Sequence, residues 1–194
     1  AKVRVDQLQN GDEEITVHGP FRAQSHDWHV PNDSSSSAFL FAFAFAQGSG
    51  EVTCKQTLLN SGRCRFIKVL ERMGAKVAVN DRKSTDHRGV EFIEEVGDVT
   101  VTCEGELRGV EISEQEAPMV IDEIPILAVI ASFASSPSHF HGLDELRVKE
   151  SDRLASTLEL LKAAGVDASS SGSDLRISPM TKAIQPFEFD ARGD

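Results

Sequence analysis

The stretch LRVKESDRL at positions 146–154 gathers five charged side chains within nine residues. Lys149 and Arg153 stand four residues apart, so a helix would place both on one face, with Glu150 on an adjacent line. The surrounding pattern predicts a strand-to-helix junction, and the start of a helix has unpaired N–H groups that attract phosphates and carboxylates. Two cations beside a carboxylate suit an anionic substrate that undergoes a proton transfer.

The same residues also fit a purely structural role. Ser151 or Asp152 has the right side chain for a helix N-cap, and Glu150 stands three residues before Arg153, which is the spacing of a surface ion pair. For residues 146–154, both interpretations stay open from the residue pattern alone. Asp122 precedes an apolar run as an N-cap would, and the pattern alone favours that structural role.

Helices and short strands that alternate along the chain must hold these residues in place. Apolar spacing, capping residues and stop glycines predict helices at 34–47, 63–73, 124–133 and 150–164. Short or alternating apolar runs predict strands at 2–5, 15–17, 50–59, 75–79, 92–93, 99–103, 110–112 and 140–143. The polar residues 81–89 are expected to form a turn. This order of elements predicts an α/β protein.

Two features of this pattern are less regular. The phenylalanines at 39, 41, 43 and 45 alternate as in a strand, but the serines before them and Gly48 after them favour a helix that contributes to the core. The pattern of cap, helix, strand, helix and stop glycine recurs after about 90 residues, with Asp33 matching Asp122 and Arg63 falling near Arg153. We therefore expect one supersecondary block to be used more than once.

The composition excludes several classes of protein. Lys and Arg number 20 against 31 Asp and Glu, a formal net charge of −11, which argues against a general binder of nucleic acid or anionic membranes. No apolar run approaches the roughly 20 residues of a membrane span, and no export signal is visible. The three cysteines lack CxxC spacing, so we expect a reduced, cytoplasmic protein without a structural metal site.

Four segments together resemble the 5-enolpyruvylshikimate-3-phosphate synthase family of enolpyruvyl transferases. They occur in the family's order and at about its spacing: VPNDSSSSAF at 30–39, LERMGA at 70–75, APMVIDEIPILAV at 117–129 and LRVKESDRL at 146–154. The resemblance implies an inside-out α/β prism, in which repeated βαβαββ units surround central helices. It also implies transfer of the enolpyruvyl group from phosphoenolpyruvate to the 5-hydroxyl of shikimate 3-phosphate, with release of phosphate and with no metal or organic cofactor.

The resemblance further implies roles for individual residues. Asp122 matches the aspartate that contacts the substrate hydroxyls and takes the 5-hydroxyl proton, and Lys149 matches the lysine beside the 5-oxygen of shikimate 3-phosphate. Glu150 matches the glutamate that handles the proton at the methylene carbon of phosphoenolpyruvate. Arg153 matches an arginine that binds phosphoenolpyruvate itself.

The sequence also departs from the family pattern. Asn32 replaces a glycine of the family's VPGD segment, and only Asn60 and Arg63 are kept from its NPTRTG stretch. Asp194 matches the first residue of a DHR motif whose arginine also binds phosphoenolpyruvate. We therefore expect residues 1–31 to be the tail of an N-terminal domain and the crossover from it, and 32–194 to be an incomplete C-terminal domain. The missing N-terminal domain would be its partner, and the piece alone is expected to be monomeric and inactive.

Two other readings of the sequence are possible. The related UDP-N-acetylglucosamine enolpyruvyl transferases share the fold but lack the LRVKESDRL helix start. A non-catalytic half-domain that binds one anion would need only the local cations and not the second domain.

Overall fold

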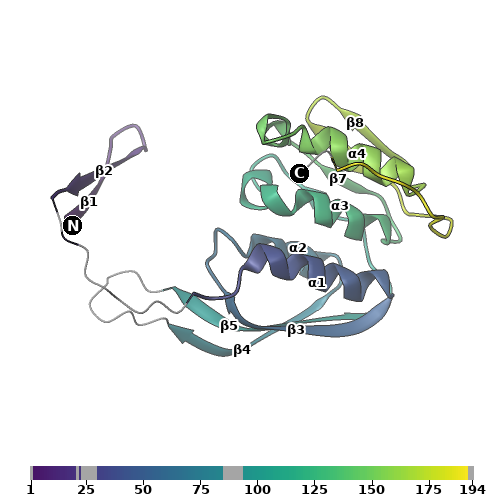
Figure 1. The fold of residues 1–194 in the computed structure, drawn as a ribbon, viewed down its shortest axis with the longest axis horizontal. Coiled ribbons are helices and arrows are strands. Elements are labelled where there is room, and N and C mark those ends of the chain that lie inside the picture. Colours follow the sequence, from purple (N-terminus) through teal and green to yellow (C-terminus); the bar gives the residue numbers. More distant parts are fainter. Residues whose placement is uncertain (1, 21, 23–29, 85–93, 192–194) are drawn as a thin grey trace.

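The computed structural model describes residues 2–20, 22, 30–84 and 94–191 (Figure 1). At the N-terminus, β1 (Lys2–Gln7) and β2 (Glu13–His18) form an antiparallel hairpin that is a sheet of its own. Val3 pairs with Val17 and Val5 with Ile15, and all four side chains are more than half exposed. The strands predicted at 2–5 and 15–17 are confirmed, with an apolar stripe that nothing in the described chain covers.

The rest of the described chain consists of two α/β units. The first contains α1 (Ser34–Ala46), β3 (Ser49–Leu58), α2 (Arg65–Arg72), β4 (Lys76–Ser84) and β5 (Glu95–Glu104). The second contains β6 (Glu111–Ile112), α3 (Ile124–Ser132), β7 (Ser138–Phe140), α4 (Arg153–Ala163), β8 (Ala168–Ser171) and β9 (Asp174–Ile177). Three short 3-10 helices occur in the second unit: η1 (Ala117–Met119), η2 (Ile121–Glu123) and η3 (Asp144–Val148).

The two units have the same topology. The first sheet has the strand order β3-β5-β4, and Asn32 adds a parallel bridge to Thr57 at the outer edge of β3. The second sheet has the order β6-β7-β9-β8, in which β6 runs parallel to β7. Each unit is therefore a short parallel strand, a helix, a strand, a helix and two antiparallel strands. This is the βαβαββ order that the family resemblance implies, and it contains the helix, strand and helix of the repeat seen in the sequence.

The helices of the two units meet between their sheets. In Figure 1, α1 lies over the β3-β5-β4 sheet and α3 lies on the other side of α1. α4 packs on α3 and on β8 of the second sheet. The buried apolar side chains of both units form one connected cluster, which includes Phe41, Phe45, Leu70, Ile124 and Leu127. The units therefore share one core.

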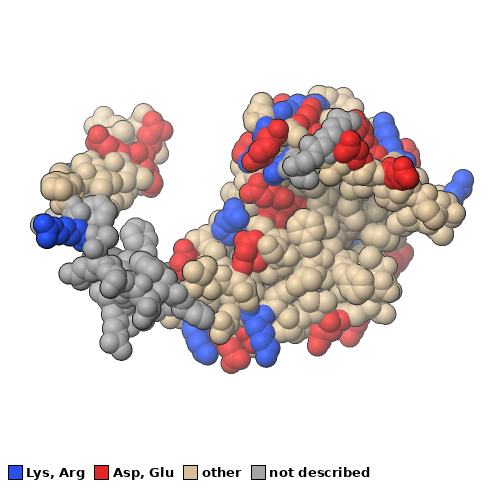
Figure 2. Space-filling model, in the orientation of Figure 1, with Lys and Arg blue, Asp and Glu red and all other residues tan. Residues whose placement is uncertain are grey.

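α1 shows why the Phe–Ala alternation forms a helix. The Asp33 carboxylate accepts the backbone N–H of Ser36 at 2.9 Å and caps the first turn. Phe41 and Phe45, one turn apart, are fully buried, whereas Phe43 and its neighbours on the opposite face are exposed. Phe41 and Phe45 therefore belong to the core, whereas Phe39 and Phe43 lie on the part of the helix that the described chain leaves uncovered. Figure 2 shows the resulting surface over α1 as almost free of charged side chains.

Several predicted boundaries need correction. α4 begins at Arg153 rather than Glu150, and the strand expected at 140–143 ends at Phe140. β4 continues to Ser84, because pairing with β5 extends through a bulge, so the turn expected at 81–89 is wrong at its start. The rest of that turn, residues 85–89, and the strand expected at 92–93 lie outside the described residues.

Candidate functional site

The carboxylate of Asp122 lies among three basic side chains. Its oxygens are 3.4 Å from Arg63 Nη1, 3.6 Å from Lys149 Nζ and 3.9 Å from Arg153 Nη1. The side chain of Asp122 is 38% exposed, so the cluster is open to solvent on one side. Three of the predicted site residues therefore meet, although Asp122 is about 30 positions from the other two in the sequence.

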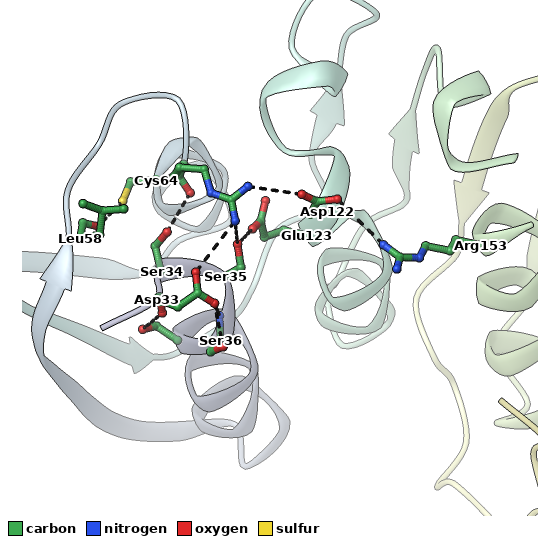
Figure 3. A network of polar contacts seen from close by, with 11 residues as sticks. Asp33, Ser34, Ser35, Ser36, Leu58, Cys64, Asp122, Glu123 and Arg153 are labelled. Carbon is green, nitrogen blue, oxygen red and sulfur yellow. Dashed lines mark hydrogen bonds and ion pairs between the residues drawn. The ribbon is translucent and has the colours of Figure 1, made fainter. Parts of the chain in front are cut away.

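The beginnings of α1, α2, α3 and α4 converge on this cluster (Figure 3). Asp33 is the N-cap of α1, Arg63 stands two residues before α2, Asp122 two residues before α3, and Arg153 is the first residue of α4. The N-terminal end of a helix carries unpaired N–H groups and a partial positive charge. Helix ends and basic side chains together make this end of the helix layer suited to anions.

The internal repeat explains why these residues meet. In the first unit Arg63 lies 3.9 Å from Asp33, and in the second Arg153 lies at the same distance from Asp122. Arg63 also crosses to Asp122 of the second unit. The cluster therefore consists of two equivalent acid–base pairs that are joined by one arginine, which lies where the packed helix ends of the two units face each other.

Lys149 and Glu150 reach the site in different ways. Lys149 follows η3 in an extended conformation and contacts Glu145 at 3.0 Å as well as Asp122. The bond to Glu145, supported by the charge of Asp122, raises the pKa of Lys149, which keeps it protonated. Glu150 is 74% exposed and pairs with Arg153 at 3.0 Å. The prediction that Lys149 and Arg153 share a helical face is wrong, because Lys149 precedes α4, yet both side chains reach Asp122.

The structural roles expected for the same residues are partly confirmed. Asp152 caps α4 by accepting the backbone N–H of Ala155 at 2.9 Å, and the Glu150–Arg153 pair forms as expected. Asp122, by contrast, does not cap α3: it lies within η2, and Glu123 takes the N-cap position without a side-chain cap bond. Pro125 in the first turn of α3 has no N–H, so one donor that a cap would satisfy is missing.

Two further residues, which had no role predicted from the sequence, belong to the cluster. Glu123 is only 4% exposed, and burial raises the pKa of its carboxyl above the ordinary value. Ser35, in the first turn of α1, donates its hydroxyl to Glu123 and accepts a hydrogen bond from Arg63 Nη2 at 3.2 Å. Arg63 was singled out by the repeat and by the NPTRTG stretch, whereas Ser35 and Glu123 lie within the family segments at 30–39 and 117–129 without an expected role of their own.

The arrangement can bind an anion and move a proton. Arg63, Lys149 and Arg153 supply fixed positive charge, which suits a phosphate or carboxylate group. Asp122 is a carboxylate held among them, so it can accept a proton from a hydroxyl bound at the same place. Among the described residues, no group of three or more His, Cys, Asp and Glu side chains is arranged to hold a metal ion. None of the described helices has the length and apolar character needed to cross a bilayer.

Comparison with known proteins identifies the family. The EPSP synthase (3-phosphoshikimate 1-carboxyvinyltransferase) family profile matches residues 1–194. The 3-phosphoshikimate 1-carboxyvinyltransferases of Gluconobacter oxydans (strain 621H) and Brucella abortus (strain S19) are 37% and 36% identical over 90% and 91% of this chain. This chain spans 38% of the length of each of them.

Solved structures give the same result. The EPSP synthase of Acinetobacter baumannii aligns with a TM-score of 0.76 and 28% identity, over 92% of this chain and 38% of its own. The enolpyruvyl transferase NikO from Streptomyces tendae, at 15% identity and a TM-score of 0.50, shares the fold over 91% of this chain and 37% of its own. The fold predicted from the sequence, an α/β fold of the enolpyruvyl transferase type, is confirmed. The chain belongs to the EPSP synthase family.

Proposed function

We propose that this chain contributes one side of the active site of an enzyme that transfers the enolpyruvyl group of phosphoenolpyruvate to the 5-hydroxyl of shikimate 3-phosphate. The observation that carries the proposal is the meeting of Arg63, Lys149 and Arg153 around Asp122 at the beginnings of α1–α4. Both substrates carry a phosphate, and phosphoenolpyruvate also carries a carboxylate. Such groups are bound by cations and helix N-termini.

The proposed roles are those that the family resemblance implies, and the contacts of the cluster support them. Asp122 accepts the 5-hydroxyl proton, and Lys149, at 3.6 Å from it, lies beside the 5-oxygen. Arg153 binds phosphoenolpyruvate and contacts both Asp122 and Glu150. A phosphoenolpyruvate molecule on Arg153 would thus lie between two carboxylates, one for the hydroxyl proton and one for the protons at the methylene carbon. Glu150 serves the methylene carbon, and its exposure leaves it free to reach a bound substrate.

The reaction has two steps. The 5-oxygen of shikimate 3-phosphate forms a bond to C2 of phosphoenolpyruvate, while Asp122 takes the hydroxyl proton and Glu150, which enters the step in its protonated form, supplies a proton to C3. In the second step the C2–O bond to phosphate breaks and the leaving phosphate takes the proton held by Asp122. A proton then leaves C3, which restores the double bond. Glu150 is the residue placed to take this second proton. Fixed charges that need no reorganisation favour both steps.

The domain boundaries belong to the same proposal. Residues 1–31 would be the tail of an N-terminal domain and the crossover from it, and 32–194 a C-terminal domain that lacks its last part. Two exposed apolar surfaces support this division: the stripe on the β1–β2 hairpin and the outer face of α1, formed by Phe39, Leu40 and Phe43. Each would be covered by a part of the longer protein, and the missing N-terminal domain would complete the substrate site.

We propose that the protein is monomeric and located in the cytoplasm. The three cysteines, Cys54, Cys64 and Cys103, are all free thiols, which suits a reducing compartment. We expect the chain alone to release no phosphate from the two substrates, because it spans 38% of the length of its relatives. It would then be a half-site that binds without catalysis.

An NMR titration of the chain with shikimate 3-phosphate tests the proposal. We expect the amide signals of Asp122, Lys149 and Glu150 to shift, and UDP-N-acetylglucosamine to leave them unchanged. Lys149→Ala should weaken binding about tenfold to a hundredfold, since hydrogen bonds to charged groups are strong. Lys68→Ala is the matched control and should leave binding unchanged, because this exposed lysine of α2 pairs with Glu71 and with no other acidic side chain in the described part of the chain. Equal shifts with both ligands, or equal losses in both variants, would contradict the proposal.

A further inference from the structure

Glu123 is a buried carboxyl group immediately next to Asp122. Only 4% of the residue is exposed, and a buried carboxylate is costly unless hydrogen bonds or charges compensate for the lost water. Its side-chain partner is the hydroxyl of Ser35 in the first turn of α1. Burial raises the pKa of Glu123, so it takes up a proton at a higher pH than an exposed glutamate does.

Ser35 connects Glu123 to the cluster. A serine hydroxyl has one proton to donate and two lone pairs that accept. The proton goes to Glu123, so the lone pairs face Arg63, whose Nη2 donates to them at 3.2 Å. The other terminal nitrogen of Arg63, Nη1, lies 3.4 Å from Asp122. A continuous path thus runs from the start of α3, through α1 and the residues before α2, back to Asp122.

We propose that Glu123 is a positioning residue, which acts through Ser35 to fix the guanidinium of Arg63 against Asp122. When Glu123 is ionised, it takes the hydroxyl proton of Ser35 and leaves the lone pairs to Arg63. When Glu123 is protonated, it becomes a donor and competes with Arg63 for those lone pairs. The positioning of Arg63 is then weakened. This role deepens the proposed function, on which its consequence for substrate binding rests.

Glu123 is surrounded by several other titratable groups. Asp122 lies on the same 3-10 helix, η2, as Glu123. Arg63 and Cys64 lie at the start of α2, and Asp33 lies at the start of α1. Hydrogen bonds from Ser36 lower the pKa of Asp33, and burial raises the pKa of the Cys64 thiol. The pKa of Asp33 is therefore lower, and that of Cys64 higher, than the ordinary value of each group. Lys149 and Arg153 lie beyond Asp122 and stay charged.

The first measurement concerns the guanidinium alone and needs no substrate. Contacts on both terminal nitrogens hinder rotation about the Nε–Cζ bond of Arg63, and ¹⁵N NMR of the whole chain measures that rotation. We expect Ser35→Ala to speed it roughly tenfold, as loss of one hydrogen bond to a charged group does. In the unsubstituted chain, rotation should speed up as the pH falls through the range in which the Glu123 carboxyl group takes up its proton. The NMR signal of its carboxyl carbon follows that titration. Glu123→Gln, whose carbonyl still accepts from Ser35, should keep slow rotation at every pH.

Matched controls separate positioning from general destabilisation. Ser132→Ala removes a hydroxyl whose bond to Val129 lies at the far end of α3, and Glu71→Gln neutralises an exposed glutamate of α2. Both should leave the rotation of Arg63 unchanged. A rotation rate in Ser35→Ala within twofold of the unsubstituted chain, or a rate independent of pH while Glu123 titrates, would overturn the proposal.

The second measurement is the affinity for shikimate 3-phosphate at pH 7.5. We expect Ser35→Ala to weaken binding several-fold and Glu123→Gln to retain it. Faster rotation of Arg63 with unchanged affinity would overturn the role of Glu123 in the substrate site. If the unsubstituted chain binds no shikimate 3-phosphate, the proposed function is contradicted, and the rotation measurement still decides whether Glu123 positions Arg63.

Discussion

Replacement of Asp122 by Asn removes the only carboxylate that contacts all three cations of the described cluster. The amide is nearly the same size, so packing is kept and the change is one of charge. Arg63, Lys149 and Arg153 then repel one another without their common partner. We therefore expect Asp122→Asn to be less stable than the unsubstituted chain, and to bind inorganic phosphate more tightly.

The separations set the magnitude. At 3.4 to 3.9 Å, each pair is worth about 1 kcal/mol in water, and double that or more near a protein surface. Measured values for exposed pairs are about 0–1 kcal/mol, and each cation keeps another acidic neighbour. The three pairs together should therefore contribute about 1–2 kcal/mol to the free energy of unfolding at low salt. In 1 M NaCl the Debye length of about 3 Å is shorter than every separation, so roughly a third should remain.

Urea unfolding at 10 mM and 1 M NaCl, followed by circular dichroism, measures this difference. Glu71→Gln is the control, because it breaks one exposed ion pair, between Lys68 and Glu71. It should lower the free energy of unfolding by less than about 0.5 kcal/mol. A loss in Asp122→Asn that does not depend on salt would refute the electrostatic reasoning. So would a loss equal to that of the control, since three shared contacts would then count no more than one.

Other substitutions test the packing and the pH dependence. Phe41→Ala should lower the free energy of unfolding by about 3–5 kcal/mol, whereas Phe43→Ala, at an exposed position, should change it by less than about 0.5 kcal/mol in urea unfolding. Gly109→Ala should destabilise by about 2 kcal/mol or more, because a Cβ there would lie 2.1 Å from the carbonyl oxygen of Pro137; thermal unfolding measures this. The hydrogen bond to the Asp174 carboxylate raises the pKa of His141, so the stability that it adds is complete below the ordinary histidine pKa and is lost as the pH rises through the raised value. Asp174→Asn should reduce that dependence, with Glu111 at 3.4 Å still favouring the charged imidazole, and an unchanged His141 titration by NMR would contradict the assignment.

Local patterns were enough to predict the helices and the repeat. α1 begins after a capping aspartate, and α2 and α4 are each followed by a glycine with positive φ, Gly74 and Gly165. These signals involve only neighbouring residues, so they can be read without the fold. The ends of strands were less predictable where the pairing strand is distant in the sequence. β4 extends to Ser84 because β5 pairs with it, and no residue pattern within β4 indicates that pairing.

In the candidate site, too, some residues could be predicted from local patterns, whereas their contacts depend on the fold. The sequence by itself predicted Asp122, Lys149, Glu150 and Arg153 as site residues, because they stand in segments whose order and spacing resemble those of one family. Only the tertiary structure brought Arg63 to Asp122, from 59 positions away, and placed Ser35 against Glu123, 88 positions apart. The tertiary structure also showed that the carboxyl group of Glu123 is buried. The physical reason is that side chains meet across helix ends only after the helices of both units pack into one core, and no local pattern encodes that contact.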